Sequence, residues 1–216
     1  MHIDLKSVGR HRLLYVMATT QEYGERLKAL IEPLITGVGP VEAAISTTRA
    51  LTGLAERRAL PTMVISLGSA GSRSLEQTRV YQASSVAYRD MDASPFGFEK
   101  GVTPFLDQPA IFPLKTPVPG LETATLSTGA DIITGTAYDA IAEDMVDMET
   151  YAVLRACSLF KVPLVALRGI SDGRDDVDHI DVWTRYLHIV DQNLADAVFR
   201  LEGTLQTQIP GREKHN

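Results

Sequence analysis

Several apolar runs of the chain lack the polar alternation of a half-solvated strand, and they predict strands that are covered on both faces, as in a parallel sheet. Two further stretches alternate more or are shorter and still favour strands. The expected strands are residues 13–18, 61–72, 79–92, 123–129 and 164–170. The second of them is expected to run into a glycine-rich turn at residues 68–71.

Apolar residues at helical spacing separate these strands. One such stripe consists of Tyr23, Leu27, Leu30, Ile31 and Leu34, and another of Trp183, Leu187, Val190, Leu194 and Val198. The expected helices are residues 19–34, 40–51, 135–145, 147–162 and 181–205, while the proline-rich residues 104–120 are expected to be irregular. Because strands and helices alternate, the sequence predicts an α/β fold with a mixed, largely parallel central sheet flanked by helices.

One strand contains a charge that needs an explanation. Arg168 stands inside the apolar run 164–170, which then stops on Ser171 and Asp172. A buried arginine without a partner would cost several kcal/mol, so Arg168 requires an anionic or strongly polar partner. The carboxyl end of such a strand is also where open α/β sheets hold their ligands.

Composition narrows the classes of protein. The 216 residues are 44% hydrophobic and favour one domain over residues 1–216, with a polar tail at 206–216 that is expected to fray. The formal net charge is -6 and the basic residues are scattered, which argues against nucleic acid as a partner. We expect no membrane span and no secretory signal, and therefore a cytoplasmic protein.

Cysteine and histidine usage argues against metal chemistry. The single cysteine, Cys157, lies in an apolar helical setting that favours packing over reactivity. His11, His179 and His188 lack ligand-like spacing, so no metal and no cofactor are expected. His179 could brace the loop after Asp172, although a surface position is the simpler interpretation.

Three of the predicted strands end in unusual residues, at 18–22, 68–71 and 168–172. If these strands are parallel neighbours, their ends share one edge of the sheet and face one pocket. Each also has a structural interpretation: Thr19 and Glu22 fit a capping box, residues 68–71 a tight turn, and Asp172 a helix N-cap.

Met148 and Glu149 follow a short apolar segment and lie at the start of a predicted helix. A carboxylate can accept hydrogen bonds from two adjacent hydroxyls, which suits the grip of a ribose. The alternative for Glu149 is a solvated residue of a first helical turn, favoured by the helix dipole.

Five blocks in order, GVGPVEAA, GSAG, DMDASPFGFEKG, VDMETYAVLRAC and LRGISD, resemble the nucleosidases of the purine nucleoside phosphorylase superfamily. Over about residues 13–200 the sequence is most similar to the 5'-methylthioadenosine/S-adenosylhomocysteine nucleosidases. The resemblance implies a nucleoside phosphorylase-like fold and hydrolysis of the N-ribosidic bond of an adenine nucleoside.

The resemblance also implies roles for single residues. Asp172 protonates the purine at N7 and Ser171 orients it. Glu22 positions the attacking water, flanked by Arg168 and Ser69, so that Glu22 and a polar ligand are expected to compensate the charge of Arg168. Glu149 holds the ribose hydroxyls, with Met148 beneath the sugar.

The family pattern places two further pairs in the site. Ile132 and Ile133 match the segment that binds adenine through its backbone, although a phenylalanine is common where this chain has Ile132. Phe96 and Phe98 match a loop that reaches into the 5'-alkylthio pocket of the neighbouring subunit, which implies a homodimer. Ordinary loop anchoring is the alternative for these two phenylalanines.

Two other functions are compatible with this fold. A phosphorylase would use phosphate in place of water, but phosphorylases of the bacterial type carry a glycine-aspartate-proline turn and an arginine where this chain has ATTQE and Ser66. Glu22 would also repel the phosphate anion. A nucleoside-binding protein without turnover is the second alternative, and the presence of both Asp172 and Glu149 argues against it.

Overall fold

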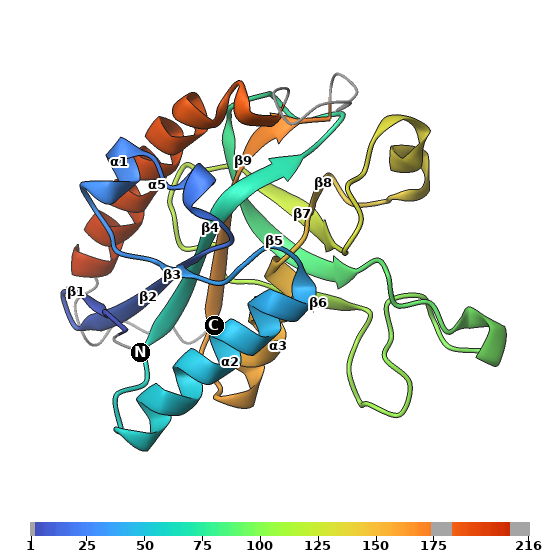
Figure 1. Cartoon of the computed structure of the whole chain (residues 1–216), viewed down its shortest axis with the longest axis horizontal. Coiled ribbons are helices and arrows are strands. Elements are labelled where there is room, and N and C mark those ends of the chain that lie inside the picture. The colour runs from blue at the N-terminus through green and yellow to red at the C-terminus, as the bar shows by residue number, and fades with distance from the viewer. Residues whose placement is uncertain (1–2, 174–182, 208–216) are drawn as a thin grey trace, which may run out of the picture.

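The computed structural model describes residues 3–173 and 183–207, which form an α/β fold (Figure 1). The strands are β1 (Lys6–Val8), β2 (His11–Met17), β3 (Leu34–Ile35), β4 (Met63–Gly71), β5 (Val80–Tyr88), β6 (Ile111–Pro113), β7 (Thr123–Thr128), β8 (Met145–Asp147) and β9 (Leu164–Asp172). The α-helices are α1 (Glu25–Lys28), α2 (Pro40–Glu56), α3 (Thr150–Leu159) and α5 (Leu187–Thr207), and the 3₁₀ turns are η1 (Thr20–Glu22), η2 (Ser94–Phe96) and η3 (Gly135–Ala140).

The central strands are parallel neighbours. β4 pairs in parallel with β2 on one side and with β9 on the other, so the ends of all three strands lie at one edge, as the sequence predicts. β9 also pairs antiparallel with β5, and β5 continues in parallel through β7 to β8. β8 returns to β4 through the pair Val146–Gly71, which closes a ring of strands and confirms a mixed sheet.

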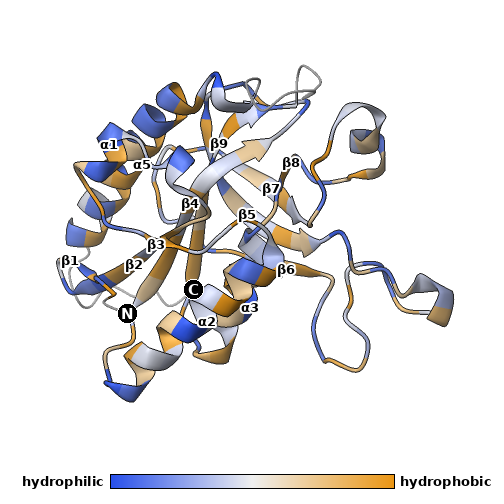
Figure 2. Ribbon diagram, viewed as in Figure 1, coloured by the Kyte–Doolittle hydropathy of each residue, from blue (hydrophilic) through white to orange (hydrophobic). Residues whose placement is uncertain are grey.

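Both faces of the sheet are covered. In β2, Leu14 and Val16 pack in the cluster that contains α2 and α3, whereas Leu13, Tyr15 and Met17 pack in the cluster that contains α1 and α5. Burial on both faces explains the continuous apolar pattern of the strands, which Figure 2 shows at the centre of the molecule. Within residues 3–173 and 183–207, no helix is long and apolar enough to cross a membrane.

The helix predicted for residues 19–34 is wrong, because only η1 and the short α1 form there. The carboxylate of Asp191 on α5 accepts hydrogen bonds from the backbone N–H groups of Arg26 (2.9 Å) and Leu27 (3.2 Å). These bonds cap the N-terminus of α1. Pro33, which lacks an N–H, precedes β3 and does not support a helix that continues to Leu34.

Other boundaries differ where strand pairing overrides local pattern. Residues 68–71 belong to β4 instead of forming a turn, since they pair with β9. The helix expected at 135–145 is the 3₁₀ turn η3 followed by β8, and α3 starts at Thr150 because β8 occupies residues 145–147. The irregular stretch 104–120 contains the short strand β6, and α5 begins at Leu187.

Candidate active site

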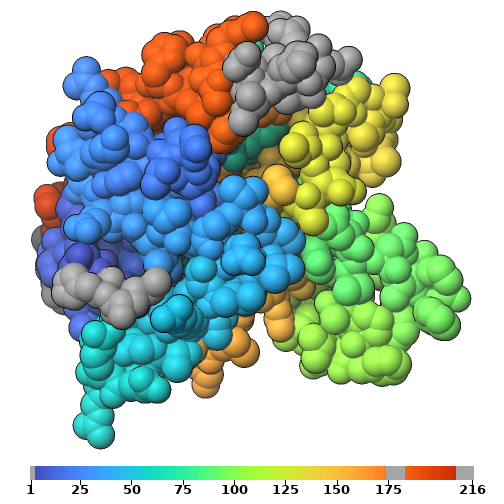
Figure 3. All heavy atoms as spheres, viewed as in Figure 1, coloured from blue at the N-terminus to red at the C-terminus, as the bar shows by residue number. Residues whose placement is uncertain are grey.

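A cavity of about 450 Å³ opens at the carboxyl ends of β2, β4 and β9. Figure 3 shows the surface hollowed between the blue N-terminal segment and the yellow segment around residues 130–145. Seven of the residues predicted for the site line this cavity: Glu22, Ser69, Ile132, Ile133, Met148, Glu149 and Asp172. The structure therefore brings together residues that lie up to 150 positions apart in the chain.

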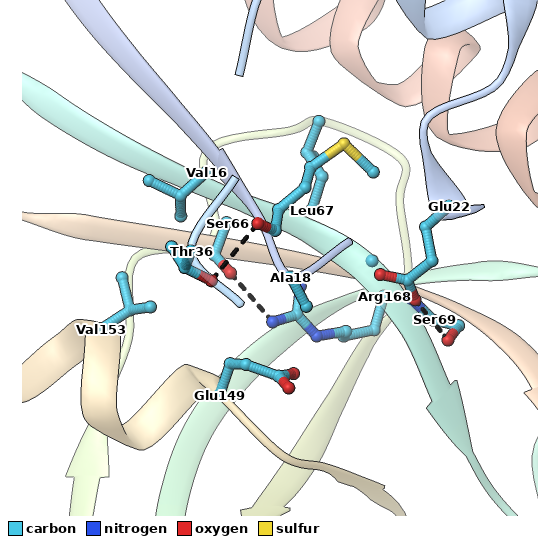
Figure 4. Close-up of a pocket in the computed structure, with 12 residues that line it drawn as sticks. Val16, Ala18, Glu22, Thr36, Ser66, Leu67, Ser69, Glu149, Val153 and Arg168 are labelled. Carbon is cyan, nitrogen blue, oxygen red and sulfur yellow. Dashed lines mark hydrogen bonds between the residues drawn. The ribbon is translucent and has the colours of Figure 1, made fainter. Parts of the chain in front are cut away.

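A smaller cavity of about 10 Å³ lies beneath the large one and has about the volume that a single water molecule requires. It is lined by Glu22, Ser69, Glu149 and Arg168. In Figure 4 Glu22 is hydrogen-bonded to Ser69, and the guanidinium of Arg168 extends toward Ser66. Glu22, Ser69 and Glu149 line both cavities, so the small cavity adjoins the large one.

Glu22 is buried and is held by Ser69. Its Oε1 accepts hydrogen bonds from the backbone N–H (2.7 Å) and the hydroxyl (2.5 Å) of Ser69. Burial raises the pKa of Glu22, and these two bonds oppose the shift. Thr19 does cap η1, since it accepts from Gln21, but the carboxylate of Glu22 turns to β4, so the capping-box interpretation of Glu22 is wrong.

Asp172 ends β9 at a register shift opposite Gly71. The Ser171 hydroxyl donates to its Oδ2 at 2.6 Å, as expected of a residue that orients it. Burial raises the pKa of Asp172, and the bond from Ser171 opposes that shift. The alternative in which Asp172 is an N-cap concerns residues 174–182, which lie outside the described residues, as does His179.

Glu149 stands at the N-cap position of α3 and is half-buried, facing the cavity. Its Oε1 accepts from the backbone N–H of Gly39 at 2.8 Å, where the positive φ of 93° suits glycine. Burial and the neighbouring charge of Asp147 raise the pKa of Glu149 to about 7. Glu149 is therefore not a solvated glutamate of a first helical turn.

Arg168 forms its direct ion pair with Asp147, whereas Glu22 and a polar ligand were expected to compensate its charge. Glu22 is close enough for the charge of Arg168 to lower its pKa, but Glu22 is not the hydrogen-bond partner of Arg168. The Nε and Nη2 atoms of Arg168 donate to Asp147 Oδ2 at 3.1 and 3.0 Å, and Nη2 also reaches Thr150 (2.6 Å) and Ser66 (2.9 Å). Residues 164, 166, 168 and 170 of β9 share the face that α3 covers, which brings Arg168 to the start of that helix.

Replacing Asp147 by alanine should destabilise the fold strongly, because it leaves Arg168 charged and unpaired at 2% exposure. We expect a loss of about 3–5 kcal/mol in the free energy of unfolding, measured by chemical denaturation. Glu76→Ala, which removes an exposed partner of Arg79, is the matched control and should cost less than about 1 kcal/mol. Equal losses in the two variants would contradict a buried ion pair that matters for stability.

Two predicted residues lie away from the cavity. Phe96 is 86% exposed on η2, and Phe98 packs edge-on against Phe105 at 5.7 Å between ring centroids. They belong to the green segment that projects from the sheet in Figure 1. Cys157 is fully buried in α3, and burial raises the pKa of its thiol to about 12, in agreement with the packing interpretation.

Three further residues of the cavity were not predicted for the site, although Trp183 was expected on the apolar stripe of the last helix. Trp183 lines the cavity and its indole N–H donates to the Ser69 hydroxyl at 3.0 Å. Arg89 donates to the backbone oxygen of Asp131 at 2.7 Å, next to Ile132. Tyr138 presents its hydroxyl from η3. None of them lies in a motif, so only the fold reveals them.

Within the described ranges 3–173 and 183–207, no cluster of three or more His, Cys, Asp or Glu residues is arranged to hold a metal ion. Among the titratable groups that line the cavity, three separate carboxylates, Glu22, Glu149 and Asp172, each have a raised pKa. Pairs of acids whose environments favour the protonated form are typical of sites for proton transfer.

Comparison with known proteins assigns the family. Residues 135–201 match the model of the phosphorylase superfamily. The 5'-methylthioadenosine/S-adenosylhomocysteine nucleosidase of Haemophilus influenzae (strain PittEE) is 33% identical over 160 residues, which are 66% of this chain and 68% of that protein. The chain belongs to this nucleosidase family. The resemblance of the five sequence blocks is thereby confirmed.

Solved structures agree with the family fold. The nucleosidase of Colwellia psychrerythraea 34H in complex with adenine superposes with a TM-score of 0.76 at 22% identity, over 96% of this chain and 99% of that one. The futalosine hydrolase of Helicobacter pylori strain 26695 gives 0.72 at 18% identity, over 88% and 96%. These superpositions show that the chain shares the overall fold of the solved structures.

Proposed function

We propose that this nucleosidase-family protein hydrolyses the N-ribosidic bond of 5'-methylthioadenosine or S-adenosylhomocysteine-type adenine nucleosides and releases adenine and the 5'-substituted ribose. The observation that carries the proposal is the convergence of Glu22, Glu149 and Asp172 on one cavity. These three carboxylates can serve the three demands of the reaction, which are a proton for the purine, a grip on the sugar and a base for water.

The leaving purine is a poor anion until N7 gains a proton, so an acid must stand beside it. Asp172 suits this role because burial favours its protonated form and Ser171 fixes its orientation at 2.6 Å. The proton moves from Asp172 to N7 as the C1'–N9 bond breaks, and the bonding electrons stay with the base. Ile132 and Ile133, which line the same cavity, would contact the adenine.

The sugar and the water occupy the other end of the cavity. Glu149 would accept hydrogen bonds from the 2' and 3' hydroxyls, with Met148 under the ring. A water in the small cavity would lie between Glu22, Ser69 and Arg168, and Glu22 would take its proton as the oxygen bonds to C1'. Arg168 lends positive charge to this end although its hydrogen bonds go mainly to Asp147.

Phosphate-dependent cleavage is less well supported. Ser66, which stands where an arginine would bind phosphate, accepts a hydrogen bond from Arg168 at 2.9 Å. The small cavity is flanked by two carboxylates, Glu22 and Glu149, which would repel an anion. Both features favour water as the nucleophile.

The direct test is release of adenine from 5'-methylthioadenosine and S-adenosylhomocysteine in phosphate-free buffer, followed by absorbance with a coupled assay. We expect multiple turnovers with at least one of the two nucleosides. A protein that binds these nucleosides tightly and releases no adenine would instead be the non-catalytic alternative.

Substrate binding should depend on pH through Glu149. The raised pKa of about 7 means that Glu149 is mostly protonated at pH 6 and ionised at pH 8. Only the ionised form accepts a hydrogen bond from each ribose hydroxyl with both oxygens, so KM should fall as the pH rises through about 7. Glu149→Gln should raise KM and remove this limb of the profile; an unchanged limb would assign it to another group.

We further infer a homodimer in which the loop of Phe96 and Phe98 from a second copy covers the 5' end of the cavity. Val38, Val41 and Ile45, at the start of α2, are 55%, 66% and 58% exposed, and Val38 also lines the cavity. An apolar patch of this kind next to a site, on a chain that also exposes Phe96 to 86%, favours an interface between two copies.

Sedimentation should therefore give about twice the chain mass of 23.6 kDa. Charges introduced by Val41→Glu and Ile45→Glu should shift the protein to monomers and lower its activity. Phe199→Glu, at an equally apolar and 72% exposed position on α5, is the control and should leave the dimer intact. A monomeric wild-type protein with full activity would contradict this arrangement.

The structure also supports inferences about the number of domains and the cellular location of the protein. The two hydrophobic clusters pack on opposite faces of one sheet, which favours a single domain over residues 1–216. The one cysteine is buried and unpaired, as is usual in the reducing cytoplasm. We accordingly place the protein there.

A further inference from the structure

Tyr138 carries a polar group that the roles given above leave unused. Its hydroxyl is buried and has no hydrogen-bond partner among residues 3–173 and 183–207, although it belongs to a residue that lines the large cavity. A buried hydroxyl without a partner is costly unless a ligand or water completes it.

Contacts of Arg73 fix the position of the Tyr138 ring. The guanidinium of Arg73 stacks over the Tyr138 ring at 5.4 Å from its centroid, and the same group donates to Asp139 (3.0 Å) and to the backbone oxygen of Gly135. Arg73 thus ties η3 to the chain that follows β4, and the phenol is presented to the cavity in a defined place.

The hydroxyl lies beside the proposed acid. A Cβ placed on Gly71 would meet Asp172 Oδ1 at 2.8 Å and the Tyr138 hydroxyl at a still shorter distance, so both oxygens converge on the same point of the cavity wall. Only glycine leaves them this space. Oδ2 of Asp172 is bonded to Ser171, which leaves Oδ1 as the oxygen on the side of Tyr138.

The phenol remains neutral at physiological pH. Burial, and then the charge of Asp172, raise the pKa of Tyr138 above its ordinary value. A neutral phenol both donates and accepts a hydrogen bond, whereas the protonated carboxyl of Asp172 presents its O–H to N7 as a donor. The pair therefore offers two different polar contacts to one edge of a ligand.

A purine presents N7 and its 6-substituent side by side on one edge. We propose that the Tyr138 hydroxyl binds the 6-substituent of the purine while Asp172 serves N7, so that Tyr138 determines which bases are accepted. This inference rests on the proposed function. As an acceptor the phenol takes the 6-amino group of adenine, and as a donor it takes a 6-oxo group, whereas a base with hydrogen at position 6 gains nothing from it.

The test compares wild type and Tyr138→Phe on 5'-methylthioadenosine and on its analogue with hydrogen at position 6. The substitution should lower kcat/KM about tenfold for the 6-amino nucleoside and leave the analogue unchanged, because only the first contacts the hydroxyl. Equal losses on both nucleosides would overturn the proposal and make Tyr138 a residue that acts on Asp172 or on the fold. Tyr88→Phe, whose ring stacks on Tyr151 outside the large cavity, should change neither.

Binding of the free bases distinguishes a failure of this proposal from a failure of the proposed function. Calorimetry with adenine and with unsubstituted purine needs no turnover, and wild type should prefer adenine by about tenfold more than Tyr138→Phe does. If no nucleoside is cleaved but this difference is found, the proposed hydrolysis is wrong and the contact between Tyr138 and the base is supported. If nucleosides are cleaved and the preference is the same in both proteins, the base contact is wrong.

Discussion

Asp172→Asn is expected to lower kcat for 5'-methylthioadenosine by about 10²- to 10⁴-fold, which is the usual contribution of a general acid. Asparagine keeps the shape of the side chain and can still accept the hydrogen bond from Ser171 that the structure shows at 2.6 Å. It has no acidic proton to give to N7, so the purine would have to leave as an anion. Nucleoside affinity, measured by calorimetry, should change little.

Asp196→Asn on the exposed face of α5 makes the same chemical change far from the cavity and should retain full activity. The pH profile adds a second readout. Because burial raises the pKa of Asp172, its acid form persists to higher pH than for an exposed aspartate, and the fall of activity at high pH should be lost in the variant. Unchanged hydrolysis by Asp172→Asn would remove Asp172 from the mechanism.

Glu22→Gln should also lose about 10²- to 10⁴-fold in kcat, for a different reason. A glutamine oxygen can still accept from the Ser69 N–H and hydroxyl, which the structure places at 2.7 and 2.5 Å, so the local geometry survives. An amide cannot take a proton from water, however, and the attack on C1' would lack its base. Rapid-quench or steady-state release of adenine measures the effect.

The control for this variant is Glu25→Gln, three residues further along the chain in α1, where the carboxylate is exposed beside Lys28. It should behave as wild type. If Glu22→Gln were as active as Glu25→Gln, the role of Glu22 would be limited to holding Ser69 in β4.

The parts of the fold that the sequence predicts well are those set by burial. The runs that become β2, β4 and β9 are mainly apolar on both faces, with exceptions such as Ser66 and Arg168, because helices cover both faces of the sheet. The stripe on α5 is equally clear, since Leu187, Val190, Leu194 and Val198 are all buried. Periodicity records these local consequences of packing directly.

The parts that could not be predicted depend on partners far away in the chain. The start of helix α1 is set by Asp191, more than 160 residues later, which accepts hydrogen bonds from N–H groups of its first turn. Residues 68–71 extend a strand because β9 offers them backbone partners, although three of the four are glycine or serine. Local propensity is weak compared with such pairing.

The candidate site divides in the same way. The proximity of Glu22, Ser69 and Asp172 follows from the rule that parallel strands present their ends at one edge, since η1 follows β2 and the other two residues lie near the ends of β4 and β9. The identity of the partner of Arg168 does not follow from this rule. Asp147 and Glu149 are both acidic and lie two residues apart, so the sequence does not show which of them faces Arg168. Tyr138 and Trp183 enter the cavity from segments whose sequence contains no motif.

Mass spectrometry of the sugar formed from 5'-methylthioadenosine in excess phosphate shows directly whether water or phosphate is the nucleophile. Because Glu22 and Glu149 line the small cavity proposed for the attacking water, and Ser66 stands where phosphorylases of this superfamily carry an arginine, we expect the free 5-methylthioribose at a rate that phosphate does not change. Accumulation of the sugar 1-phosphate, with no adenine released when phosphate is absent, would contradict it.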